Sequence, residues 1–160
     1  MTLSHLDNAG RPRMVDVSTK AETRREATAR GQVRCHAQAL ALMREQAAPK
    51  GDVLTVAQLA GIMAAKQTAQ LIPLCHPLPL THIDVELRAD DGIPGVDITA
   101  TVRTNAATGV EMEALTAVSV AALTVIDMIK SADPWATVCD VGVLRKSGGR
   151  SGERIRPGRG

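Results

Sequence analysis

Glu113, Asp127 and Lys130 are three of the four charged side chains in a largely apolar stretch over residues 111–132. At about 100° per residue, all three fall on one side of a helix. An aspartate and a lysine three positions apart can exchange protons in a partly desolvated pocket. They can equally form a surface ion pair worth about a few tenths of a kcal/mol. The spacing alone leaves both readings open.

The separation along this predicted helix limits what one substrate can touch. Glu113 and Asp127 are fourteen positions apart, a rise of about 21 Å. We therefore expect that a small substrate does not contact both within one subunit. The sites are separate, the ligand is long, or a second subunit completes the pocket.

Three other segments have residue types suited to binding or catalysis. Residues 72–79 hold three prolines around Cys75 and His76, which predicts a stiff loop presenting His76 in one direction or an ordinary connection. Residues 146–152 combine glycines, serines and cations, as in loops that bind phosphate, although a flexible turn has the same composition and the P-loop order is missing. Lys50 precedes a predicted helix start, where anions are favoured, but a solvated turn lysine is equally consistent.

The elements that must position these residues alternate between strand and helix patterns. Period-two alternation predicts strands at residues 27–35, 81–87, 96–102 and 138–144. Residues 36–48, 54–71 and 111–132 read as helices, the last with a capping box from Thr108 and Glu111. Without the second helix, the order is the ferredoxin-like β-α-β-β-α-β pattern. We expect an α+β sandwich with an extra helix, a mostly antiparallel sheet and helices on one face.

Composition excludes several classes of protein. The chain has 160 residues, 44% of them hydrophobic and 22% charged, which fits one globular domain over residues 1–160. One Trp and no Phe or Tyr argue against nucleic-acid binding through stacked bases. No apolar run approaches the ~18–20 residues of a membrane span, and residues 1–17 lack a signal-peptide pattern, so we expect a cytoplasmic protein with no membrane partner.

Cysteines and charge add two expectations. The three cysteines, Cys35, Cys75 and Cys139, are widely spaced, so we expect free thiols and no metal site. Residues 145–160 hold six cations against Glu153, which leaves the rest of the chain net acidic. We expect residues 1–20 to form an extended arm and residues 153–160 a flexible basic tail.

Several segments together resemble a known family. They are MVDVSTKAETRREATA (14–29), KGDV (50–53), AGIMAAKQT (60–68), LIPLCHPL (71–78), TGVEMEALTAVSVAALTVIDMIK (108–130) and KSGGRSG (146–152). In this order the chain resembles the molybdenum cofactor biosynthesis protein C family, the cyclic pyranopterin monophosphate synthases. The resemblance runs from about residue 6 to residue 152; residues 131–140 and the tail after residue 152 depart from the pattern.

The resemblance implies a lyase that converts 3′,8-cyclo-7,8-dihydro-GTP to cyclic pyranopterin monophosphate and diphosphate. It implies no redox cofactor and a homohexamer, a trimer of dimers, with sites between subunits. The implied catalytic residues are Asp127, Lys130 and Lys50. The implied substrate-binding residues are Leu74, Cys75, His76, Met112 and Glu113, with Lys66, Lys146, Lys20 and Arg25 as weaker candidates. The alternative is a non-catalytic, oligomeric purine-nucleotide sensor of the same fold.

Overall fold

The computed structural model describes residues 9–46, 48–92, 94–150 and 152–157. Its elements run in the order β1 (Thr23–Arg34), α1 (Ala37–Arg44), α2 (Val53–Lys66), α3 (Thr68–Leu71), β2 (Leu80–Asp90), β3 (Gly95–Ala106), α4 (Glu111–Ile129), β4 (Thr137–Ser147) and β5 (Arg154–Ile155). The strands form one sheet in the order β2-β3-β1-β4-β5, and each neighbouring pair is antiparallel. This confirms the predicted ferredoxin-like α+β fold.

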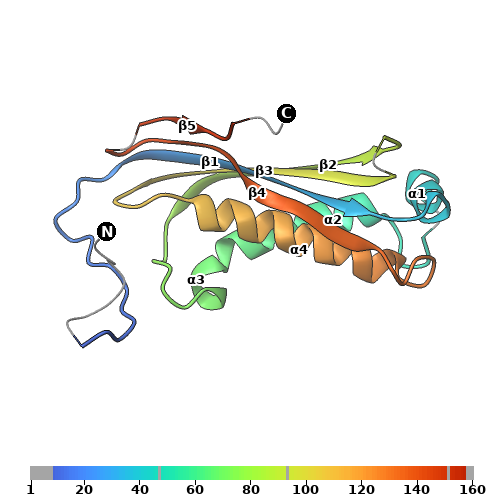
Figure 1. The fold of residues 1–160 in the computed structure, drawn as a ribbon, viewed down its shortest axis with the longest axis horizontal. Helices are drawn as coiled ribbons and strands as arrows, with labels where there is room; N and C mark the ends of the chain where they lie inside the picture. Colours follow the sequence, from blue (N-terminus) through green and yellow to red (C-terminus); the bar gives the residue numbers. More distant parts are fainter. Residues whose placement is uncertain (1–8, 47, 93, 151, 158–160) are drawn as a thin grey trace.

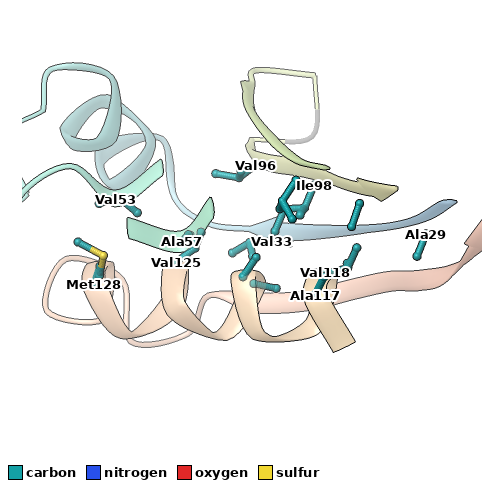
Figure 2. Packing of buried hydrophobic residues seen from close by; sticks show 14 of the residues in the cluster. Ala29, Val33, Val53, Ala57, Val96, Ile98, Ala117, Val118, Val125 and Met128 are labelled. Atoms are coloured by element: carbon teal, nitrogen blue, oxygen red, sulfur yellow. The ribbon is translucent and has the colours of Figure 1, made fainter. Parts of the chain in front are cut away.

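The helices α2 and α4 cover one face of the sheet (Figure 1). Apolar and polar side chains alternate along β3, and the apolar ones point toward these helices. The buried set is Val96, Ile98, Ala100 and Val102, each fully buried. Figure 2 shows Ile98 and Val33 of the sheet facing Val118 and Val125 of α4. Since the chain has one aromatic residue, small aliphatic side chains fill this core.

The backbones of α2 and α4 approach closely where they cross. A side chain at Gly61 would place its Cβ 2.9 Å from the carbonyl oxygen of Ala117, so only glycine fits there without a shift. The start of α2 lies near the end of α4, where Lys50 contacts Asp127. The two helices therefore run antiparallel. Residues near the start of α4 and residues near its end lie at opposite ends of the molecule.

Several predicted details differ from the structure, among them the helix predicted over residues 36–48, which ends at Arg44. The helix expected over residues 54–71 breaks at Gln67 into α2 and α3. The capping box was wrong, because Val110 is the N-cap residue of α4 and makes no side-chain cap bond, while Glu111 pairs with Lys146. The helix predicted to reach residue 132 ends at Ile129, and the tail expected to be flexible forms β5, which pairs with β4. Residues 158–160 of that tail, and residues 1–8 of the arm, lie outside the described residues.

The turn after α4 is fixed by a buried carboxylate. Asp133 is 1% exposed and accepts hydrogen bonds from the backbone N–H groups of His36 at 2.7 Å and Trp135 at 3.0 Å. Burial opposes ionisation, but these bonds and the nearby His36 side chain outweigh it and hold the pKa of this carboxyl below its usual range. The end of α4 is thereby tied to the start of α1.

Among the described residues, α4 is the one helix whose length and composition would allow it to cross a membrane. It packs instead as the core helix, against α2 and the sheet, and much of it is buried. This makes its hydropathy weak evidence for a membrane span.

Candidate functional site

The end of α4 near α1 carries a cluster of two lysines and one aspartate. Lys50 Nζ donates to Asp127 Oδ2 at 2.5 Å and to the Asp127 backbone oxygen at 3.1 Å, and Lys130 Nζ lies 2.8 Å from Oδ1. Both carboxylate oxygens are therefore held by ammonium groups. The hydrogen bonds from Lys130 and then Lys50 lower the pKa of Asp127 to about 2.

Local structure explains how Lys50 reaches this position. Gly51, with φ of 92°, closes a turn in which its N–H donates to the Ala48 oxygen at 2.9 Å. Asp52 then caps α2 by accepting from the Thr55 N–H at 3.1 Å. The turn holds Lys50 against α4. The spacing of a lone turn lysine does not predict this contact, and only the resemblance groups Lys50 with Asp127 and Lys130.

The cluster is open to solvent in the single chain. About half of each side chain is exposed, 50% for Lys50, 54% for Asp127 and 60% for Lys130. The partly desolvated pocket expected around this pair is therefore not formed by the chain alone.

A cavity of about 340 Å³ lies at the opposite end of α4; we call it the His76 cavity. The loop before β2 contributes Leu74, Cys75 and His76, and α4 contributes Met112 and Glu113. These are the five substrate-binding residues that the resemblance implies, and the structure brings them together. The rest of the lining is Val15, Val17, Lys20, Leu78, Thr108, Gly109 and Glu111.

Burial raises the pKa of two titratable groups in the His76 cavity. Glu113 is 3% exposed, and burial, aided by the charge of Glu111, raises the pKa of its carboxyl. Burial also raises the pKa of the Cys75 thiol, with a smaller contribution from Glu113. Cys75 is therefore a neutral thiol at neutral pH, since its ordinary pKa already lies above 7, which suits contact with a ligand rather than nucleophilic attack.

A second cavity, of about 670 Å³, adjoins the first; we call it the Arg25 cavity. Lys20, Thr108, Gly109 and Glu111 line both. The cationic residues of the second lining are Lys20, Arg25, Lys146 and Arg150, against one carboxylate, Glu111. Glu111 Oε1 accepts from Lys146 Nζ at 2.6 Å. Within the described ranges, no carboxylate forms an ion pair with the other three cations, whose charge can therefore face an anion.

The glycine-rich loop after β4 closes on Arg25. Gly148 and Gly149 have φ of 97° and 69°, a region that favours glycine, and a side chain at Gly149 would overlap the Arg25 guanidinium. Arg25 Nη2 donates to the Ala107 oxygen at 3.2 Å. Its buried Nε has no hydrogen-bond partner in the part of the chain that the structure describes.

Lys66 and the Lys50–Asp127–Lys130 cluster stand apart from both cavities. Lys66 is an exposed residue in the last turn of α2, and neither cavity lining includes it or the cluster. A third cavity, of about 220 Å³, lies over Asp84, Glu86, Arg88, Asp97, Thr99 and Thr101 of β2 and β3 and includes none of the predicted site residues.

Sequence reasoning missed several lining residues. The sequence predicts Glu111 only as a capping residue, and Val15 and Val17 only as part of an extended arm. Arg150, by contrast, belongs to the loop at residues 146–152 that is predicted to bind phosphate. The alternation of Val15 and Val17 with polar residues was a usable signal that one side of the arm is covered.

Comparison with known proteins places this geometry in context. The MoaC family matches residues 14–149. A cyclic pyranopterin monophosphate synthase of Cereibacter sphaeroides (strain KD131 / KCTC 12085) is 57% identical over 150 residues, covering 94% of both chains. Enzymes of the same name from Trichodesmium erythraeum (strain IMS101) and Nocardioides sp. (strain ATCC BAA-499 / JS614) are 58% and 56% identical, covering 94% and 97% of this chain and 91% and 96% of their own.

Proposed function

The chain belongs to the MoaC family, and from this premise we propose that its two cavities and its lysine–aspartate cluster form the active site of a cyclic pyranopterin monophosphate synthase. The family makes it an enzyme of molybdenum cofactor biosynthesis. The substrate would be 3′,8-cyclo-7,8-dihydro-GTP, and the products cyclic pyranopterin monophosphate and diphosphate.

The observation that carries this assignment is the pairing of a purine-sized cavity with a cationic one. A carboxylate such as Glu113 can accept two N–H groups from a guanine-type edge, as two hydrogen bonds to a charged acceptor. The Arg25 cavity then faces the triphosphate, whose negative charge grows on the diphosphate as it leaves. The two cavities adjoin at Lys20 and Glu111, which suits one ligand that spans both.

The cluster supplies the groups for proton transfer. Asp127, with a pKa of about 2, is ionised at neutral pH and can accept a proton. Lys50 and Lys130 carry protons that can be donated to a developing anion. Opening of a purine ring needs transfers of both kinds, and one carboxylate held between two ammonium groups provides them within hydrogen-bond distance.

We infer that a second copy of the chain brings the two parts together. The cluster and the His76 cavity occupy opposite ends of α4, and the cluster is half exposed. The outer sides of α2 and α4 expose large apolar side chains, with Leu59 at 58%, Met63 at 53% and Leu123 at 59%. Apolar side chains exposed on neighbouring helices mark an interface where they form one surface. The hexamer that the resemblance implies would cover this surface and complete the site.

The direct test measures diphosphate release from 3′,8-cyclo-7,8-dihydro-GTP generated in situ. We expect Asp127→Asn to lower turnover about 10²- to 10⁴-fold, the usual range for a general acid or base. Asp91→Asn is the matched control, because Asp91 is also an exposed aspartate in an ion pair, with Arg44 at 2.8 Å, and should keep full turnover. A folded wild-type protein that binds the nucleotide but releases no diphosphate would instead support the non-catalytic sensor.

A further inference from the structure

Residues 15–20 of the arm cover part of the site. Val15 and Val17 are half-buried and line the His76 cavity, while Asp16 and Ser18 between them are exposed. This alternation turns the apolar side chains inward along an extended segment. Figure 1 shows the arm, in blue, at the end of the molecule where α4 begins.

The segment has its own hydrogen bonds. Asp16 Oδ1 accepts from the Ser18 N–H at 2.9 Å and from its hydroxyl at 2.6 Å, an Asx turn. The Lys20 N–H donates to the Val17 oxygen at 2.9 Å. These two consecutive turns give residues 15–20 a defined shape, although the segment belongs to no long strand or helix.

His76 is the side chain that holds this segment to the body of the protein. Its Nε2 lies 2.7 Å from the Val15 backbone oxygen. A carbonyl oxygen only accepts hydrogen bonds, so Nε2 must carry the proton and donate. The prolines around His76 and the bond from the Cys75 N–H to the Ile72 oxygen at 3.1 Å restrict the loop and fix the direction of the imidazole.

The far end of the segment places a cation where the two cavities meet. Thr19, Lys20 and Ala21 line the Arg25 cavity, and Lys20 also lines the His76 cavity. The position of Lys20 therefore depends on the turn at residues 17–20 and on the bond that anchors Val15.

We propose that residues 15–20 form a lid over the joined cavities, and that His76 is a positioning residue that latches it shut through Val15. The latched lid holds Lys20 at the anion site. Release of one hydrogen bond and exposure of two valines opens it. The latch concerns the free protein and stands independently of the proposed reaction; only its use on the substrate rests on the proposed function.

The latch is tested first by hydrogen exchange without any ligand. In His76→Ala, we expect the amides of residues 15–20 to exchange about 5- to 10-fold faster, the effect of losing one hydrogen bond. In His76→Gln, whose side-chain N–H can reach the same carbonyl, exchange should stay near that of the wild type. His82→Ala, on β2, is the control. Unchanged exchange in His76→Ala would overturn the latch. So would faster exchange of the lid amides that is matched by equally faster exchange of the β3 amides. If His76→Ala fails to fold, His76→Asn replaces it, because the Asn side chain is too short to reach the Val15 carbonyl.

The positioning role is tested with inorganic tripolyphosphate as a probe of the Arg25 cavity. His76 does not line that cavity. If His76 acted only by touching a ligand directly, His76→Ala would therefore bind tripolyphosphate as tightly as the wild type. A latch that positions Lys20 predicts about 5- to 10-fold weaker binding, restored in His76→Gln. Equal affinities would overturn the positioning role. A wild-type protein that binds no tripolyphosphate would count against the proposed anion site, while the exchange experiment would still decide the latch.

Discussion

Two variants that are each impaired should restore activity when they share an oligomer. Asp127→Asn removes the proton acceptor of the cluster, and Glu113→Gln removes the carboxylate of the His76 cavity. The two residues lie about 21 Å apart along α4, a buried helix that packs on the sheet and cannot bend to bring its ends together. If each site takes Glu113 from one subunit and Asp127 from another, some sites in a mixed oligomer will have both wild-type residues.

The size of the recovery follows from counting. In a randomly mixed oligomer with equal amounts of both variants, a site drawn from two subunits has both wild-type residues about one time in four. We therefore expect about a quarter of wild-type diphosphate release. Asp127→Asn alone should retain no more than about one part in 10². Glu113→Gln alone should lose about 10- to 150-fold in substrate affinity, so the assay is run at substrate concentrations below the wild-type KM.

A second mixture provides the matched control. Asp127→Asn and Lys130→Ala both damage the cluster, so every site in that mixture has a defective cluster and no recovery is expected. Differently tagged variants would be co-expressed and the hetero-oligomers isolated through both tags. If these contain both Asp127→Asn and Glu113→Gln chains but stay as inactive as either variant alone, then one subunit supplies both residues, and the reasoning from the length of α4 fails.

Two further predictions concern the linings of the cavities. Gly149→Ala should cost about 1–2 kcal/mol in unfolding free energy, from its left-handed backbone, and should also weaken tripolyphosphate binding, because the new methyl group displaces Arg25. Gly152→Ala is the control, since Gly152 has φ of 61° and nothing lies within 4 Å of an added Cβ; it should lose similar stability but keep its affinity for tripolyphosphate. Denaturation measures the stability and calorimetry the affinity. Equal affinities of the two variants would contradict the role of Gly149. Burial raises the pKa of Glu113, so its folded-state pKa exceeds the unfolded one, and the wild type loses stability as pH rises through the folded value. Glu113→Gln should therefore gain in Tm over the wild type as pH rises from about 4 to about 8, and a pH-independent difference would refute the burial of a charge there.

The strands were readily predicted because one face of the sheet is buried. Along β2 and β3, residues such as Val85, Ile98 and Val102 alternate with polar ones, and a shift by one position would expose every one of them. The same rule failed for β5, which is two residues long. It is held by backbone pairing to Arg145 and Lys146, and so short a segment carries no period in its side chains.

Helix ends were harder to predict than helices, because the competing partners lie far away in sequence. Thr108 and Glu111 have the spacing of a capping box, but Lys146, thirty-five positions on, takes the Glu111 carboxylate. The absence of a side chain at Gly109 leaves room for that carboxylate to fold back. The break at Gln67 differs, because it has a local partner: Thr68 is buried, and its hydroxyl donates to the Ala65 oxygen, three positions earlier, at 3.0 Å.

The elements packed around α4 explain why the candidate site is divided between the two ends of this helix. The residues that we propose bind the substrate lie where a stiff loop, the arm and the glycine-rich loop surround the start of the helix. The cluster sits where α4 ends, beside a turn that brings in Lys50. Asp133, buried just beyond, ties that end to α1 through His36, so the lysines and Asp127 are held on a rigid part of the fold. An open carboxylate between two ammonium groups has a pKa of about 2 and is a weak base in water. Covering it with a second subunit would exclude water and strengthen every charge interaction there, so assembly, rather than any motion within the chain, is the step that would turn this cluster into a catalyst.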